Sequence, residues 1–299
     1  MKKKVFAMMM VAVLAVSMTA CGQTGATAES AAPADVQEEE SAADGAAETE
    51  SAGEDEVDGA QQAEADRTTF TVGFDAEFPP YGYKDESGEY VGFDLDLAEE
   101  VCSRNGWELI KQPIDWDSKD MELSSGTIDC IWNGFTMNGR EEQYTFSVPY
   151  VDNSQVFVVA ADSGIETLAD LAGKVVGVQK ESSALAALED EDHTELLASF
   201  ATLNQYADYN TGFMDLEAGA IDALAMDIGV ADYNMGQRSG SFVILEEKLA
   251  TEQYAIGFLK GNTELKDAVE KTLLEMADDG TFMQIAEEYG LADSVCLGK

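Results

Sequence analysis

The chain has 299 residues and carries 59 acidic against 17 basic side chains, which gives a formal net charge of -42. This excess of acid argues against a nucleic-acid partner, because phosphate backbones are bound by clusters of Lys and Arg. Four cysteines and a single histidine show no metal-ligand spacing, so neither a metal nor another cofactor is expected. A disulfide between Cys102 and Cys130 stays open at this point.

The N-terminus has the pattern of an export signal. Three lysines at positions 2–4 precede an apolar run at residues 5–16, which is too short to span a bilayer, and small residues follow. The end of this segment resembles the lipobox of bacterial lipoproteins, with Met18 where Leu is usual and Cys21 as the acylated residue. We therefore expect residues 1–20 to be a signal peptide and the lipid on Cys21 to be the only membrane attachment. A plain secretory signal is the alternative.

Residues 21–66 differ in composition from the rest of the chain. After Cys21 they contain no aromatic residue, no Lys and no Arg, and are rich in Ala, Glu, Asp, Ser and Gly. Such a segment buries too little apolar surface to offset its chain entropy, and its like charges repel one another. We expect an acidic, disordered tether, and solvation alone explains its acid runs.

From Arg67 onward, strand and helix patterns alternate. Polar and apolar residues alternate over 70–74, as in a half-buried strand, and two prolines then predict a rigid loop. Asp94 is expected to cap a helix that runs to about Arg104. The other elements expected in this half are strands at 90–93, 107–112 and 128–132 and a helix at 117–123. This βαβ rhythm predicts a parallel sheet with helices on its faces.

A second α/β series begins with the apolar strand 155–160. It is expected to continue with strands at 174–179, 223–226 and 241–245 and with helices from residue 182, at 213–218 and at 228–235. One alternating strand over 253–259 then leads into helices at 264–277 and 281–289. The roughly 230 residues after the tether are enough for one large domain or for two lobes.

Four short segments carry a resemblance to a known family. They are 78–83 with 88–98, 132–136 with Arg140 and 146–150, 168–178, and 253–258. In this order they resemble the polar amino-acid-binding family of bacterial periplasmic solute-binding proteins, family 3. The four segments cover the whole chain after Arg67, which makes the resemblance far more specific than any one of them alone.

The resemblance implies an α/β fold of the type II periplasmic-binding-protein kind, with two lobes joined by two hinge strands and the ligand held between them. Carried over to this chain, lobe 1 would comprise 67–152 plus 253–299, and lobe 2 would comprise 153–252. The hinge strands would lie near 150–154 and 250–254. The second α/β series and the returning strand agree with this arrangement without proving it.

A free amino acid is a zwitterion, and both of its charges must be paired when it leaves water. The resemblance implies that Arg140 binds the carboxylate through a bidentate guanidinium contact. Backbone N–H groups at the helix start near Ser182, and the hydroxyls of Ser182 and Ser183, would assist it. For the ammonium group, the resemblance implies the residues Asp227, Gly134 and Thr136.

Each assignment has a structural alternative. Arg140 lies beside two glutamates and could be a surface residue paired with an acid, and Asp227 could be no more than the N-cap of the next helix. The loop between Thr136 and Arg140 is one residue shorter than is usual in the family. The reach of Arg140 is therefore open.

Side-chain recognition is implied at the other end of the ligand. Phe78 and Trp116 would stack on its apolar stem, although either could be ordinary core. Asp75 matches the distal position and Glu77 lies close to it, while Gln179 stands where some glutamine-binding relatives carry Lys. We therefore expect a basic or amide side chain, and cystine or another polar amino acid stays open.

The expected function is that of an extracytoplasmic, lipid-anchored, monomeric receptor that captures a polar L-amino acid and delivers it to an ABC importer. The chain has no phosphate-binding Gly-Lys-Ser/Thr loop, so ATP hydrolysis would belong to the permease–ATPase partner. No catalytic residue is expected. The alternatives are a ligand-sensing module and an enzyme that resembles cyclohexadienyl dehydratase, in which Asp75 or Glu77 would act as acid or base.

Overall fold

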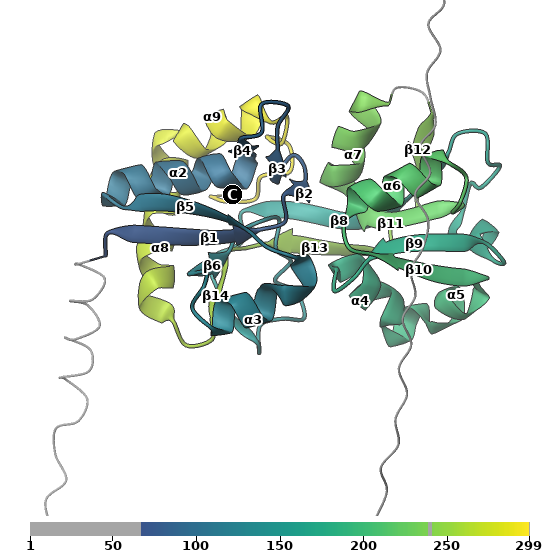
Figure 1. Ribbon diagram of the computed structural model, residues 1–299, viewed down its shortest axis with the longest axis horizontal. Coiled ribbons are helices and arrows are strands. Elements are labelled where there is room, and N and C mark those ends of the chain that lie inside the picture. The colour runs from purple at the N-terminus through teal and green to yellow at the C-terminus, as the bar shows by residue number, and fades with distance from the viewer. Residues whose placement is uncertain (1–66, 239–240, 299) are drawn as a thin grey trace, which may run out of the picture. The chain divides into compact units, whose positions relative to one another are not determined.

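The computed structural model describes residues 67–238 and 241–298 (Figure 1). The predicted signal peptide, the lipidation site Cys21 and the tether 21–66 lie outside this part of the chain. Within the described residues, no helix is both long and apolar enough to cross a membrane. Cys102 and Cys130 are buried thiols that do not form a disulfide.

The first sheet has five strands in the order β5-β1-β6-β14-β7. Its strands are β1 (Thr69–Phe74), β5 (Glu108–Pro113), β6 (Cys130–Ile131), β7 (Tyr144–Phe146) and β14 (Gly257–Leu259). β1 pairs in parallel with both β5 and β6, whereas β14 is antiparallel to β6 and β7. Because β1 lies inside the sheet, the residues that follow its C-terminal end, including Asp75, are directed toward the site described below.

Helices and a small second sheet complete this part, which we call lobe 1. Figure 1 shows α2 and α9 on one side of the five-stranded sheet and α3 on the other. The helices are α2 (Phe93–Asn105), η1 (Trp116–Ser118), α3 (Lys119–Ser124), α8 (Thr263–Asp279) and α9 (Thr281–Glu288). The small sheet is formed by β2 (Glu77–Phe78), β3 (Gly82–Lys84) and β4 (Tyr90–Val91).

The other sheet, of six strands, defines lobe 2 and has the order β10-β9-β11-β8-β12, with β13 also paired to β8. Its strands are β8 (Val151–Ala160), β9 (Val175–Gln179), β10 (Thr202–Tyr206), β11 (Ala223–Asp227), β12 (Phe242–Ile244) and β13 (Ala250–Tyr254). The helical segments are η2 (Leu168–Leu171), α4 (Ser183–Glu189), η3 (Glu191–His193), α5 (Thr194–Ser199), α6 (Tyr209–Glu217) and α7 (Ile228–Gln237). β9 is parallel to β10 and β11, and the fold class is the predicted two-lobed α/β type.

Two antiparallel strands connect the lobes. β8 and β13 pair from Val151 with Tyr254 to Gln155 with Ala250. The prediction of one strand over 253–259 was wrong, because β13 ends at Tyr254 and the chain enters the lobe 1 sheet as β14. Alternation continues on both sides of this break, so the hydrophobic period does not reveal it. The lobe boundaries at 152/153 and 252/253 stay a prediction.

The predicted N-cap role of Asp94 was also wrong. α2 begins at Phe93, and Gly92 occupies the N-cap position. The Asp94 carboxylate is buried and accepts hydrogen bonds from the Gly134 N–H and, at 2.9 Å, from the Tyr150 hydroxyl. Burial raises the pKa of Asp94 to about 7. The start of α2 therefore holds the loop at Gly134, which is one of the predicted site residues.

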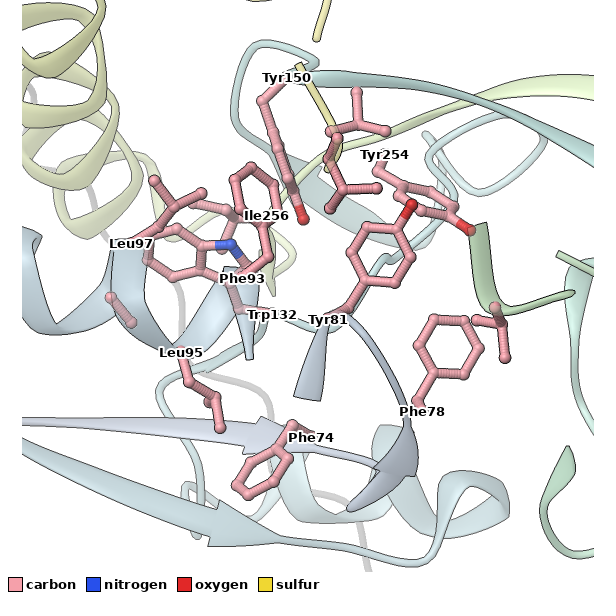
Figure 2. Close-up of a cluster of buried hydrophobic side chains, with 14 of the residues drawn as sticks. Phe74, Phe78, Tyr81, Phe93, Leu95, Leu97, Trp132, Tyr150, Tyr254 and Ile256 are labelled. Atoms are coloured by element: carbon pink, nitrogen blue, oxygen red, sulfur yellow. The ribbon is translucent and has the colours of Figure 1, made fainter. Parts of the chain in front are cut away.

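A cluster of buried aromatic side chains lies next to this loop. In Figure 2, Tyr81 and Tyr254 approach each other while Phe78 lies at the edge of the cluster, and the Tyr81 and Tyr254 ring centroids are 5.2 Å apart in an edge-to-face arrangement. Each such ring buries about 150–250 Å². Because Tyr254 comes from β13 and Tyr81 from the loop after β2, the cluster ties the end of the connecting strand to lobe 1.

Candidate functional site

Nine of the predicted site residues line one cavity. It is formed by residues of both lobes and has a volume of only about 10 Å³, room for about one water molecule. The lining residues are Phe78, Trp116, Gly134, Thr136, Arg140, Gln179, Ser182, Ser183 and Asp227. The other two, Asp75 and Glu77, line a neighbouring cavity of about 550 Å³.

Arg140 lines the cavity and has the surroundings of an anion-binding residue. Its guanidinium donates to the carbonyls of Thr136 at 3.1 Å and Glu181 at 3.4 Å, and it lies 5.0 Å from the centre of the Phe135 ring. Within the described residues it forms no ion pair, so the alternative of a salt-bridged surface arginine is not what the structure shows. A guanidinium has five N–H donors, so most of them are left for an anion.

The segment opposite Arg140 has a left-handed residue. Glu181 has φ 53°, and this conformation directs its carbonyl to the Arg140 guanidinium. The Ser182 hydroxyl donates to the Gln179 carbonyl at 2.8 Å and accepts from the Leu185 N–H at 3.1 Å, which caps α4. Its hydroxyl is thus committed within the protein, and its role toward a ligand stays a prediction.

Asp227 ends β11 and occupies the N-cap position of α7, but its carboxylate makes no capping hydrogen bond. It accepts instead from Asn153 at 2.8 Å, Gln155 at 2.6 Å, the Tyr254 hydroxyl at 2.6 Å and the Tyr209 hydroxyl at 3.1 Å. Burial, together with a neighbouring carboxylate, raises the pKa of Asp227 to about 7. A buried carboxylate with only neutral donors is suited to pair with a cation.

Gly134 and Thr136 lie next to this carboxylate. Gly134 has φ 55°, and a Cβ at this position would lie 2.8 Å from the Phe78 ring and 2.9 Å from the Tyr254 ring. Only glycine fits such a left-handed position between two rings. The Thr136 hydroxyl donates to Glu252 at 2.9 Å, so its lone pairs are available to accept a hydrogen bond from a ligand.

Phe78 and Trp116 both line the cavity and both pack into cores. The Phe78 ring centroid is 5.9 Å from that of Tyr209, and Trp116 meets Phe135 edge to face at 5.7 Å. The functional and structural interpretations of these rings are therefore compatible. The packing holds each ring in place at the cavity wall.

The far end of the site is acidic. Asp75 accepts from the Gln179 amide at 2.7 Å, and burial raises the pKa of Asp75 to about 6. The neighbouring cavity of about 550 Å³ is lined by six carboxylic acids and by no Lys or Arg among the described residues. These acids are Asp75, Glu77, Asp115, Asp117, Glu122 and Asp208.

Four polar residues of this region were not predicted from the sequence, namely Asn153, Gln155, Tyr209 and Glu252. All four are at most 7% exposed and belong to one hydrogen-bond network around Asp227. In it, Tyr209 donates to Asp227 and Asn153 donates to Glu252. The sequence does contain one signal for Glu252. It stands just before the motif that starts at Gln253 and two residues before Tyr254, so the two side chains share the inward face of β13. The others are ordinary strand and helix residues in the sequence.

Residues 70–292 match the family description of bacterial extracellular solute-binding proteins, family 3. The chain belongs to this family. The match includes both lobes and every residue of the predicted amino-acid site.

Individual relatives of this solute-binding protein agree with the assignment. The L-cystine-binding protein TcyJ of Escherichia coli strain K12 is 29% identical over 231 residues, which cover 76% of this chain and 85% of TcyJ. The arginine-binding extracellular protein ArtP of Bacillus subtilis is 29% identical over 231 residues, with 76% and 88% covered. An ABC uptake transporter substrate-binding protein from Streptococcus pneumoniae, solved with bound histidine, has a TM-score of 0.74 and 34% identity, covering 81% of this chain and 99% of that chain.

Proposed function

We propose that this solute-binding protein is a monomeric, extracytoplasmic receptor for a polar L-amino acid with a basic or amide side chain, which it delivers to an ABC permease–ATPase complex. The observation that carries the proposal is that Arg140 and Asp227 line the same cavity, with Phe78 and Trp116 in its wall. This arrangement offers a cation for a carboxylate, a carboxylate for an ammonium group and rings for an apolar stem.

The cavity volume implies that binding is coupled to movement of the lobes. About 10 Å³ is far too little for an amino acid, so a ligand enters only when the lobes separate. Hydrogen bonds cross between the lobes at the site, among them those from Gln179 to Asp75, from Arg140 to the Glu181 carbonyl and between the Thr136 and Ser183 hydroxyls. A ligand that contacts both lobes shifts the population toward the closed form, which is the form a permease would recognise.

The preference for a basic or amide side chain rests on the acidic far end. Asp75 and the acid-lined cavity beside it attract a cationic group, and Gln179 offers an amide in place of a cation. A relative named for arginine and a structure solved with bound histidine agree with a basic side chain. The relative named for cystine makes cystine the main competing ligand.

A screen of the whole purified chain by thermal shift tests this proposal. The ligands are the twenty amino acids with ornithine, citrulline and cystine, each at high concentration. A ligand at 100 times its dissociation constant stabilises the native state by about 2.7 kcal/mol, which is a visible shift. We expect the largest shifts from Arg, Lys, ornithine, His or Gln. A shift from cystine alone would support an amino-acid receptor but contradict the preference for a basic or amide side chain. No shift from any ligand would overturn the proposal.

Asp75→Asn should change side-chain selectivity. The variant keeps the size and an oxygen that accepts from Gln179 but loses the negative charge, so we expect affinity for L-arginine to fall about tenfold or more relative to L-glutamine. Titration calorimetry with both ligands measures the ratio. Asp267→Asn, on the exposed face of α8, is the matched control and should leave both affinities unchanged. An unchanged ratio in Asp75→Asn would remove Asp75 from the specificity site.

The lipid anchor is proposed from the sequence of residues 1–21. Cys21→Ala should release the protein from the membrane fraction, because the thioether-linked lipid would then be missing. Fractionation of cells that express each form, followed by immunoblotting, measures this. Lys299→Ala, at the opposite end of the chain, serves as the control. If the Cys21→Ala protein stays in the membrane fraction, another anchor holds it.

The dehydratase alternative fits the ammonium end poorly. A prephenate-like substrate has no ammonium group, so the buried Asp227 carboxylate would stay without a cation. Incubation of the chain with prephenate should give no product above background.

The sensing alternative shares the same ligand site, and uptake of the labelled amino acid by cells with and without this protein distinguishes transport from sensing.

A further inference from the structure

Glu252 is a buried carboxylate on the connecting strand β13, and it is only 7% exposed. One of its oxygens, Oε1, accepts four hydrogen bonds. The donors are the Thr136 hydroxyl at 2.9 Å, Asn153 at 2.7 Å, Gln155 at 2.7 Å and the Ser183 hydroxyl at 3.3 Å. Glu252 thus links the site loop of lobe 1 to the start of α4 in lobe 2.

The same two amides also bind the carboxylate of Asp227. Asn153 Nδ2 donates to Asp227 Oδ1 at 2.8 Å, and Gln155 Nε2 donates to that oxygen at 2.6 Å. Oxygens of two buried carboxylates therefore meet at the same two nitrogens. Within residues 67–238 and 241–298 no Lys or Arg forms an ion pair with either carboxylate. Two such charges close together are costly unless a proton or a cation lies between them.

The surrounding amides add acceptors. Asn153 Oδ1 and Gln155 Oε1 are buried and have no hydrogen-bond partner in the described part of the chain. Their orientation is set, because the nitrogen of each amide donates to the carboxylates. The region accordingly has two carboxylates that accept only from neutral donors among the described residues and two amide oxygens without a donor there. A cation that carries several N–H groups satisfies such a surplus of acceptors.

Glu252 also sets the direction of the Thr136 hydroxyl. The Thr136 hydroxyl lies 2.9 Å from Glu252 Oε1 and 3.1 Å from the Ser183 hydroxyl, and when it donates its one proton to the charged Glu252 its oxygen is presented to the cavity as an acceptor. A ligand ammonium, which only donates, requires this direction. Thr136 and Ser183 both line the cavity, and Glu252 contacts both.

We propose that Glu252 is a second carboxylate of the ammonium site: it contacts Thr136 and Ser183, which line the cavity, adds its negative charge to that of Asp227, helps to orient the Thr136 hydroxyl as an acceptor, and thereby selects ligands that carry an α-ammonium group. This inference rests on the proposed function and deepens it. Glu252 acts as a positioning residue through Thr136 and as a specificity-determining residue through its charge.

The test compares the whole chain with its Glu252→Gln variant in titration calorimetry. The probes are L-arginine and L-glutamine and their deaminated analogues, 5-guanidinopentanoate and 4-carbamoylbutanoate. Glutamine at position 252 keeps the shape but loses the charge, so affinity for the two amino acids should fall about tenfold or more. Affinity for the deaminated analogues should change little, so the preference for the ammonium form shrinks. A structural defect alone would weaken both classes equally.

Two further variants keep the test decisive. Glu252→Asp retains the charge and should retain most of the ammonium preference, even if packing suffers. Glu270→Gln, a half-buried glutamate whose carboxylate accepts from the Val148 N–H, is the matched control and should leave the preference unchanged. An unchanged ratio of amino acid to analogue in Glu252→Gln overturns the inference alone. Absence of binding by the unaltered chain to all four probes overturns both the inference and the proposed function.

Discussion

Replacing Arg140 with Ala should weaken binding of the amino acid by more than about 2 kcal/mol, which is roughly a 30-fold loss of affinity. The guanidinium is held within lobe 1 by the Thr136 carbonyl and the Phe135 ring, so it is already placed for a carboxylate before the ligand arrives. Removing it leaves the ligand carboxylate without a cation in a closed cavity. Titration calorimetry with the best ligand from the thermal-shift screen measures the loss.

The control for this experiment is Arg104→Ala. Arg104 forms an exposed cluster with Glu100 and Asp279 on lobe 1, so its loss affects stability slightly and ligand affinity not at all. Arg140→Lys is a useful third variant, because it keeps the charge but cannot form the bidentate contact, and we expect an intermediate affinity. Equal affinities of Arg140→Ala and the unaltered chain would remove Arg140 from the site.

Asp227→Asn should weaken binding of amino acids far more than binding of their deaminated analogues. The change removes the charge that faces the ammonium group, while the one remaining oxygen can still accept the hydrogen bond from Tyr254 and the amide nitrogen replaces the oxygen that accepts from Tyr209. We expect a loss of about tenfold or more for L-arginine and L-glutamine. The loss should be smaller than that of Arg140→Ala, because Glu252 keeps part of the negative charge.

The measurement is again a pair of titrations, with the amino acid and with its deaminated analogue. Asp222→Asn, at the start of the same strand region, is the matched control, since its carboxylate accepts from the Val175 N–H away from the cavity. Equal losses for amino acid and analogue in Asp227→Asn would contradict the ammonium role and would point to a purely structural effect of this residue.

The principal residues of the candidate site could be named from the sequence because the family resemblance gives their order along the chain. Arg140, Asp227 and seven others line one cavity, and their roles in binding stay predictions. Composition and spacing alone would not have brought Trp116, Arg140 and Asp227 together, because that proximity depends on the packing of two lobes. Judging the alternatives for Arg140 and Asp227 required the structure, in which the described residues form no ion pair with Arg140 and the Asp227 side chain makes no capping hydrogen bond.

Two errors have a common physical cause. Asp94 before an apolar run has the sequence pattern of an N-cap, and 253–259 has the pattern of one strand, but tertiary contacts decided both cases. The Asp94 side chain turns inward to hold Gly134, and the strand divides where the chain passes from one sheet to the other. Local patterns report which residues are buried, not which partner they meet.

Glu252 was missed for a related reason. A glutamate in a strand pattern is usually on the solvent face, and its burial follows only from the pairing of β13 with β8, which places Glu252 opposite Asn153. The network around Asp227 is therefore a property of the two connecting strands. Its residues become visible as a group only in the folded chain.

One polar amino acid is expected to bind between the lobes, with its carboxylate at Arg140 and its ammonium at Asp227. Titration calorimetry of the whole chain against L-Arg, L-Lys, ornithine, L-His, L-Gln and cystine tests it most directly, with the Arg140→Ala/Asp227→Asn double variant run alongside. We expect saturable binding of one ligand per chain for at least one basic or amide amino acid, and no measurable binding to the double variant. Saturable binding that survives in the double variant, or none of these ligands binding the unaltered chain, would contradict it.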